Sequence, residues 1–181
     1  MTTPALTLTD LSVTFATDGG AVRAVSEVSF DVHPGEVLAV VGESGSGKSV
    51  SVRSAIGLLP STASVRGSVT LGDRDVIGLG DKQWAQLRGR DVAMVFQEPG
   101  SALDPLFTVG YQIVEALRAH PGPDGSRMDK KAARRRAVEL LDLVGLPDPE
   151  RRFGYYPHEL SGGQKQRVMI AIAISCEAKV I

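Results

Sequence analysis

The fold of this chain is decided at Gly42-Glu43-Ser44-Gly45-Ser46-Gly47-Lys48-Ser49, a stretch that matches the pattern G-x-x-x-x-G-K-[ST] without a mismatch. With glycine at about 7% of residues, the fixed positions of this pattern should occur by chance in roughly one chain in two hundred of this length. An ordinary glycine turn is the alternative, and the flanking sequence speaks against it. We therefore predict a phosphate-binding loop, or P-loop, at residues 42–49.

The residues on either side of the loop fit this prediction. The apolar run Val37-Leu38-Ala39-Val40-Val41 is rich in β-branched residues and predicts a buried parallel strand that leads into the loop. Residues 49–56 predict a helix that ends near Gly57 and Pro60. A strand, a glycine loop and a helix N-terminus place backbone N–H groups around an anion, and the helix dipole adds favourable potential there.

Each residue type in the loop has a physical reason. Glycines let the backbone approach the phosphates, where side chains would stand in the way. In P-loop proteins the lysine reaches the β- and γ-phosphates as a cation, and the hydroxyl that follows it binds magnesium. We therefore expect Lys48 to have the first role and Ser49 the second.

A P-loop alone is also found in GTPases, kinases and helicases, so it does not identify the class of protein. The stretch Leu160-Ser161-Gly162-Gly163-Gln164 distinguishes between these classes. This pentapeptide should appear by chance in on the order of one such chain in five thousand. Ser161 is a good N-cap for a helix predicted over residues 164–175, and the two glycines leave the first N–H groups uncovered. The pentapeptide therefore predicts a second anion site at a helix N-terminus.

Together the P-loop and this pentapeptide resemble the ATP-binding cassette (ABC) family of transport ATPases. The resemblance implies ATP and Mg²⁺ as ligands, and it makes residues 160–164 the signature segment. In the family this segment binds the γ-phosphate held by the P-loop of the opposite subunit, so that ATP lies between two cassettes. The resemblance therefore implies a second ABC cassette, identical or paralogous, in a head-to-tail pair.

Two further positions match the cassette pattern. Phe15 matches the aromatic residue that stacks on adenine in the family, although a Phe on an alternating strand is more often a core residue. Gln97 follows a predicted strand at residues 92–96 and matches the family's Q-loop glutamine, which contacts magnesium and couples the site to the membrane partner. The resemblance thus implies Lys48 and Gln97 as catalytic residues, and Ser49 and Gln97 as magnesium ligands.

The sequence around these motifs resembles one branch of the family, the importers of oligopeptides, dipeptides and nickel. That branch commonly reads Q-[ED]-P, S-L-[ND]-P and T-V-G. This chain has Gln97-Glu98-Pro99, Ser101-Ala102-Leu103-Asp104-Pro105, Thr108-Val109-Gly110 and Tyr156-Pro157-His158-Glu159. The resemblance implies the ATP-binding subunit of an importer for peptides or related small solutes. Its partners would be two membrane-spanning permease subunits and, indirectly, an extracytoplasmic solute-binding protein.

The composition agrees with a subunit that lies outside the bilayer. There are 20 Lys+Arg against 21 Asp+Glu, for a formal net charge of -1. No apolar run approaches the ~20 residues that span a bilayer, the longest being residues 168–174. The start Met1-Thr2-Thr3-Pro4 shows no secretory signal. The resemblance to the importer subunits then implies a peripheral protein on the cytoplasmic face of the cell membrane.

Other chemistry has weaker support in the sequence. The basic run at residues 130–136 could bind nucleic acid, but the charge is balanced overall and no aromatic residue interleaves the run, so we predict a solvated helix face and no nucleic-acid partner. The one cysteine, Cys176, excludes an internal disulfide and predicts a packing role. His33, His120 and His158 lie far apart, and none has a ligand-spaced partner.

Coarse patterning predicts the remaining elements. Residues 5–36 predict antiparallel strands, and residues 68–71 add another. Residues 111–119 and 130–144 predict helices separated by a loop at residues 120–125. In the family, helices at this place form the helical subdomain, which faces the membrane subunits.

The expected fold class is an α/β P-loop NTPase of the ABC cassette type, with a mixed sheet, an antiparallel β subdomain and a helical subdomain. We divide the chain into the β subdomain with the P-loop core at residues 1–96 and the Q-loop with the helical subdomain at residues 97–160. The signature helix, with the start of a further strand, occupies residues 161–181.

The last residues depart from the family's pattern. After the signature helix, a cassette continues into an apolar strand that ends in an Asp for magnesium (Walker B), then a Glu, a D-loop and a switch His. The stretch Lys179-Val180-Ile181 resembles the beginning of that strand. We therefore expect a partial cassette whose parent protein is an ATPase. The 181-residue chain itself should hydrolyse ATP poorly and be marginally stable, with an unpaired sheet edge.

Two alternatives to the importer ATPase remain. The first is a non-catalytic ATP-binding, or inactive, fragment of such a subunit. The second is an ABC ATPase of DNA repair or chromosome organisation. Those proteins resemble cassettes interrupted by long coiled coils or zinc modules between the P-loop and the signature, and this chain has neither heptads nor cysteine pairs there.

Overall fold

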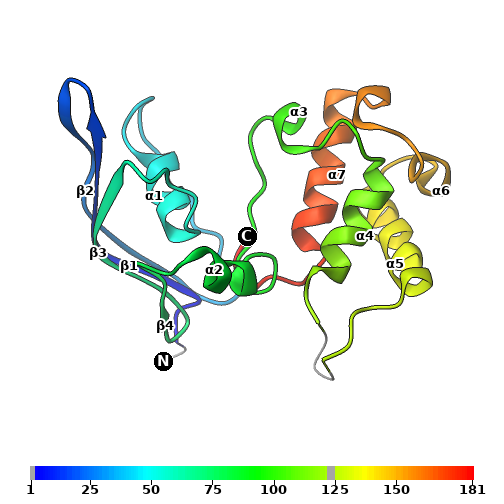
Figure 1. Cartoon of the computed structure of the whole chain (residues 1–181), viewed down its shortest axis with the longest axis horizontal. Helices are drawn as coiled ribbons and strands as arrows, with labels where there is room; N and C mark the ends of the chain where they lie inside the picture. The colour runs from blue at the N-terminus through cyan, green and yellow to red at the C-terminus, as the bar shows by residue number, and fades with distance from the viewer. Residues whose placement is uncertain (1–2, 122–124) are drawn as a thin grey trace. The chain divides into compact units, whose positions relative to one another are not determined.

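The computed structural model describes residues 3–121 and 125–181, which form two compact units. The first unit is the chain up to Arg88 with Val180, and the second is Gly89–Lys179 with Ile181. The elements in chain order (Figure 1) are β1 (Leu6–Thr17), β2 (Gly20–Val32), α1 (Lys48–Ala55), β3 (Ala63–Leu71), β4 (Arg74–Asp75), α2 (Asp81–Leu87), α3 (Pro99–Ala102), α4 (Val109–Ala119), α5 (Lys130–Leu143), α6 (Pro149–Arg152), the 3-10 helix η1 (Pro157–Glu159) and α7 (Gly162–Ile174).

The first unit is built on a four-stranded antiparallel sheet with strand order β2-β1-β3-β4. Strand β1 pairs with β2 on one side and with β3 on the other. The antiparallel strands predicted at residues 5–36 and 68–71 are therefore confirmed, and β3 begins earlier than predicted, at Ala63.

A β-bulge in β1 keeps its apolar side chains on one face of the sheet. Leu8 lies before the bulge and Leu11 after it, and both are buried, although their spacing is odd. Asp10 has a φ of 48°, in the left-handed region, and supplies the extra residue. Gly67 lies opposite with a φ of 93°, where a Cβ would be 2.5 Å from the carbonyl oxygens of Thr9 and Asp10. The buried face of β1 therefore continues across the bulge.

Helix α1 packs on this sheet and contacts β1, β2 and β3 (Figure 1). It covers residues 48–55, which confirms the helix predicted over residues 49–56 to within a residue at each end. Gly57 ends it with a φ of 66°. Arg88 then donates from Nε to the carbonyl of Ile56 at 3.1 Å and from Nη2 to that of Gly57 at 2.6 Å. These bonds satisfy carbonyl groups that the helix end leaves open.

The strand predicted at residues 37–41 is wrong for this structure. The segment has no regular secondary structure, and the side chains of Val37 and Val41 are 95% and 92% exposed. An extended segment becomes a strand only when neighbouring strands take its N–H and C=O groups. Within the described residues, the one sheet joins β1 to β4 and leaves residues 37–41 unpaired. The predictions of strands at residues 92–96 and from Lys179 onward are also wrong. In these two segments, only Val92 and Val180 form single β-bridge pairs.

The second unit is a helical layer around one apolar core. The helices predicted at residues 111–119 and 130–144 are confirmed as α4 and α5, and that predicted at 164–175 as α7. Of the loop predicted at residues 120–125, residues 122–124 lie outside the described residues. The buried core consists of Leu103, Val109, Ile113, Leu117, Ala133, Ala137, Leu140, Leu141, Leu146, Leu160, Val168, Met169 and Ala171.

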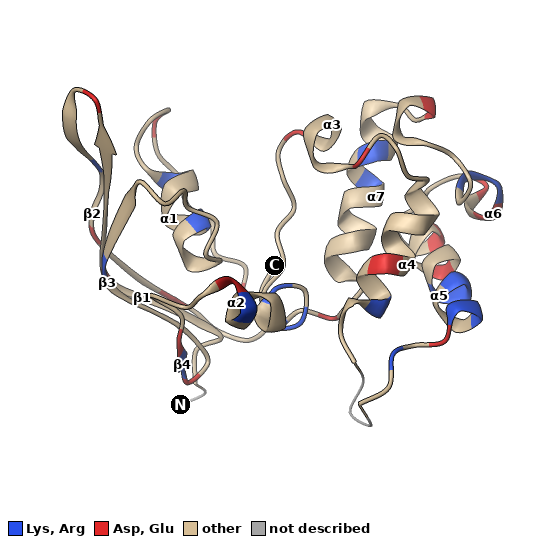
Figure 2. Cartoon of the chain, in the orientation of Figure 1, with Lys and Arg blue, Asp and Glu red and all other residues tan. Residues whose placement is uncertain are grey.

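The basic run of α5 lies on the face of the helix away from this core. Lys130, Lys131, Arg134 and Arg135 are exposed, which confirms a solvated face (Figure 2). Cys176 is half-buried, and its Sγ donates to the carbonyl oxygen of Ala116 at 3.2 Å. Among the described helices, none combines the length and the apolar character that crossing a bilayer requires.

Candidate functional site

The loop at residues 42–47 is held against the sheet at Gly47. This residue is the N-cap of α1 and has a φ of 91°. A Cβ at Gly47 would lie 2.5 Å from the carbonyl oxygen of Ala24 in β2. Only glycine accepts both the left-handed backbone and this close approach. The last loop glycine therefore fixes the start of α1 relative to β2.

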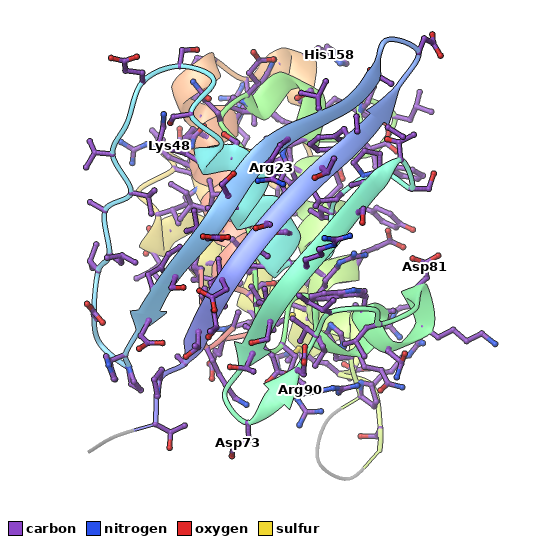
Figure 3. All side chains as sticks on the ribbon, turned by 90° about the vertical axis from the view of Figure 1, so that its left-hand side faces the viewer. Arg23, Lys48, Asp73, Asp81, Arg90 and His158 are labelled. Atoms are coloured by element: carbon purple, nitrogen blue, oxygen red, sulfur yellow. The ribbon has the colours of Figure 1, made fainter. Side chains whose placement is uncertain are left out.

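Lys48 folds back over the loop that precedes it. Its Nζ donates to the carbonyl oxygens of Gly42 at 2.7 Å and Glu43 at 2.6 Å, and to the Ser46 hydroxyl oxygen at 3.3 Å. Figure 3 labels this side chain at the start of α1. The ammonium group is therefore already centred in the loop, at the place where a phosphate would need a positive charge.

The loop is open to a ligand from outside. Glu43, Ser44, Gly45 and Ser46 are exposed, and a Cβ at Gly45 would meet nothing within 4 Å. The first N–H groups of α1 have no partner inside the helix, as at any helix start. Cation, loop backbone and helix N-terminus together suit an oxyanion such as a phosphate.

Two of the predicted site residues carry oxygen donors of the kind that bind magnesium. Ser49 is exposed at the start of α1, and Gln97 is exposed at a bend before α3. A hydroxyl and an amide oxygen are hard donors of the kind that Mg²⁺ prefers. Among the described residues, no group of three or more His, Cys, Asp or Glu could hold a metal ion. Each of these side chains therefore has a donor of a type that suits Mg²⁺, an ion that usually takes its other ligands from phosphate and water.

The predicted site residues are distributed over both units. Phe15 and the P-loop lie in the first unit, whereas Gln97 and the signature segment lie in the second. Phe15 pairs with Val22 and Ala63 near the end of β1, and its ring is half-buried. This position keeps part of the ring accessible to a ligand.

The signature segment forms a capped helix start. The Ser161 Oγ accepts a hydrogen bond from the Gln164 N–H at 3.3 Å, and the Gln164 Oε1 accepts one from the Ser161 N–H at 3.0 Å. This reciprocal capping box confirms Ser161 as the N-cap of α7. Leu160, immediately before it, is buried in the core.

The two signature glycines are not required by packing within the chain. A Cβ at Gly162 or at Gly163 would meet nothing within 4 Å, and neither residue has a positive φ. Both residues are exposed. Because an alanine would fit at either position, the glycines leave room for something that approaches the helix N-terminus from outside.

One contact beside this segment has no signal in the sequence. Arg167, on α7, donates from Nη1 to the carbonyl oxygens of Val144 at 2.7 Å and Gly145 at 2.9 Å, at the end of α5. A glycine after a predicted helix indicates a C-terminal cap, but no pattern in the sequence pairs that cap with an arginine on another helix.

Exposed apolar side chains gather near α3 and α4. Leu106 is 78% exposed, and Phe107 stacks on Tyr111 with ring centroids 4.9 Å apart. Leu106 also lines a cavity of about 570 Å³ with Pro105, Arg151, Gly154, Tyr155, Tyr156, His158 and Glu159. We call Leu106, Phe107, Tyr111 and Tyr156 the aromatic patch. Exposed apolar surface of this kind is typical of protein contact sites.

Comparison with known proteins gives the family. The family described as "ABC transporter" matches residues 25–181. The chain is 56% identical over 172 residues to the oligopeptide transport ATP-binding protein OppD of Mycobacterium tuberculosis, covering 95% of this chain and 28% of that protein. It is 46% identical over 178 residues to the dipeptide transport ATP-binding protein DppD of Bacillus subtilis, covering 97% and 52%. The chain thus spans about a quarter to half of these relatives.

Among solved structures, the chain resembles the ATP-binding cassette MJ0796 in a dimeric post-hydrolysis state bound to ADP and Pi. The TM-score is 0.81 at 27% sequence identity, and the match covers 96% of this chain and 70% of that one. The cbiO1 subunit of Clostridium perfringens matches with a TM-score of 0.69 at 24% identity, which concerns the fold alone. The predicted fold class, a P-loop ABC cassette, is confirmed.

Proposed function

This chain belongs to the ABC transporter family, and from that membership we propose that it is the ATP-binding part of an importer for peptides or related small solutes. The observation that carries the proposal is that one chain contains both a lysine-centred loop and a helix start whose glycines have no internal role. The names of the similar proteins support peptides as the solute class and favour this reading over the DNA-repair alternative.

The chain's own residues would hold the nucleotide as follows. The loop at residues 42–47 surrounds the phosphates with backbone N–H groups, and Lys48 contributes the positive charge. Phe15 stacks on the adenine with the exposed part of its ring. Ser49 would bind Mg²⁺, which would neutralise charge at the phosphate oxygens, and the family's pattern gives Gln97 the same role. Gln97 also transmits the state of the site to the membrane partner.

Pairing with a second cassette completes the site. The segment from Leu160 to Gln164 of one cassette would lie against the phosphates on the P-loop of the other, with its free helix N–H groups directed at them. The open space at Gly162 and Gly163 supports this arrangement, because a phosphate can approach their backbone closely. The dimeric state of MJ0796 supports it as well. The pair would consist of identical or paralogous chains.

The other partners follow from the proposed role. Two membrane-spanning permease subunits would dock on the second unit, and the aromatic patch offers them a contact site. The cassette would then be a peripheral protein at the cytoplasmic face of the membrane. A solute-binding protein on the other side of the membrane would act on it only through the permeases.

Nucleotide binding by the complete gene product tests the proposal. Lys48→Ala should weaken the binding of a fluorescent ATP analogue by about tenfold or more, because hydrogen bonds to a charged group contribute about 1.5–3 kcal/mol. Lys82→Ala removes another exposed lysine of the same unit and should bind like the wild type. Unchanged binding and unchanged peptide uptake in the Lys48→Ala protein would refute the assignment.

A further inference from the structure

Arg167 joins the signature helix to the end of α5. Helix α5 closes with a left-handed cap, in which Gly145 has a φ of 73°. The Gly145 N–H donates to Asp142 at 2.8 Å and the Leu146 N–H to Leu141 at 2.9 Å. The carbonyl groups of Val144 and Gly145 remain at the cap, and both accept from Nη1 of Arg167. Two segments far apart in the sequence are therefore tied by one charged group.

The chemistry of this contact makes it specific. A guanidinium is a strong donor, and the carbonyl end of a helix carries partial negative charge that a cation stabilises. A Cβ at Gly145 would overlap Nη1 of Arg167, so a larger residue there would displace the guanidinium from this position. Donor and acceptor sites are thus fitted to each other, and a change on either side breaks the contact.

Helix α3 contacts α7, but few side chains of the first turns of α7 are buried. Ser161, Gly162 and Gly163 are exposed, and the buried side chains of the helix begin only at Val168. Leu160 anchors the chain on the near side. The position of the signature N–H groups therefore depends on the contact with α3, on Leu160 before them, and on Arg167 and Val168 after them.

We propose that Arg167 is a positioning residue for ATP turnover: without touching nucleotide, it fixes the signature N–H groups by anchoring α7 to the cap of α5. This inference rests on the proposed function. A displacement of about 1 Å in such groups lowers a rate by up to about a hundredfold. Binding of ATP to the P-loop of a single cassette does not involve this contact and should not change.

The test uses ATP turnover by the complete gene product. Arg167→Ala and Arg167→Gln should each lower kcat by about ten- to a hundredfold. In both variants, the affinity of the P-loop for a fluorescent ATP analogue should stay close to the wild-type value. The melting temperature should also stay close to that of the wild type. Arg167→Lys should recover part of kcat, because an ammonium can still reach one of the carbonyl groups. Arg136→Ala, which breaks an exposed ion pair to Glu139 on α5, serves as the control and should leave kcat unchanged.

The acceptor side gives an independent test. Gly145→Ala should lower kcat similarly, and the double variant with Arg167→Ala should be no worse than either single variant, because both break one contact. The inference would be overturned if a folded Arg167→Ala or Arg167→Gln protein had the wild-type kcat. It would also be overturned if the losses in kcat from Arg167→Ala and Gly145→Ala were fully additive in the double variant. If Lys48→Ala also leaves turnover unchanged, the proposed function fails instead.

Discussion

Replacing the two signature glycines by alanine should raise stability and lower activity at once. A Cβ at Gly162 or Gly163 meets nothing within 4 Å, and neither residue has a positive φ, so the alanines cause no strain. Alanine reduces the conformational freedom of the unfolded chain and favours the helix, which stabilises by about 0.4–1 kcal/mol per position. In a protein of about 150–250 residues, each kcal/mol raises the melting temperature by about 2–4 °C, and the shift is smaller in a longer protein.

The same methyl groups would stand where we place the phosphate of the opposite cassette. They keep the anion from the backbone N–H groups at the start of α7, and the loss of even one such donor in an enzyme site costs about a hundredfold in rate. We therefore expect the double variant of the complete gene product to lose at least about tenfold in kcat. Its affinity for ATP at the P-loop should be unchanged.

Thermal unfolding and steady-state ATP turnover, measured on the same samples, decide the matter. The matched control is Gly100→Ala on α3, which also meets nothing within 4 Å and should leave turnover unchanged. A lower melting temperature in the Gly162→Ala and Gly163→Ala double variant would refute the open-space argument. Undiminished turnover would refute the idea that these glycines admit a ligand.

Three further predictions concern stability. Backbone N–H groups, that of Ala132 foremost, hold the pKa of Asp129 below its ordinary value. Their contribution to stability is present above the unfolded pKa of about 4 and is lost as the pH falls through the folded pKa, so the difference in melting temperature between wild type and Asp129→Asn should shrink below pH 4. Gly57→Ala should destabilise the first unit by more than about 1 kcal/mol, because its Cβ would overlap the indole of Trp84 and its φ is 66°; the emission of this single tryptophan reports the change. Leu141→Ala should cost about 2–5 kcal/mol in urea unfolding, since Leu141 is fully buried.

The sequence predicted the parts of the fold that depend on local patterns. The N-cap at Ser161 with Gln164 three residues later is a short-range signal, and the structure forms that capping box. The helices α4 and α5 followed from apolar spacing for the same reason. Where a few neighbouring residues determine the geometry, the prediction and the structure agree.

Parts that depend on distant partners were not predictable in this way. Residues 37–41 have the composition of a strand, but a strand exists only if another strand pairs with it, and composition does not report pairing. The contact from Arg167 to Gly145 joins residues 22 apart across two helices. The left-handed glycine could be expected after α5, whereas the arginine that binds it depends on how α7 packs.

The three hydrogen bonds of Lys48 affect how tightly this loop can bind a nucleotide. A lysine ammonium has three N–H donors, and Gly42, Glu43 and Ser46 already occupy them at 2.7, 2.6 and 3.3 Å. An incoming phosphate oxygen therefore replaces an acceptor and does not fill a vacant position. The longest bond, to the Ser46 hydroxyl, is the one to exchange first. Affinity at this loop is then a difference between two acceptors competing for one nitrogen, and it depends as much on the bond that Lys48 gives up as on the bond that it gains.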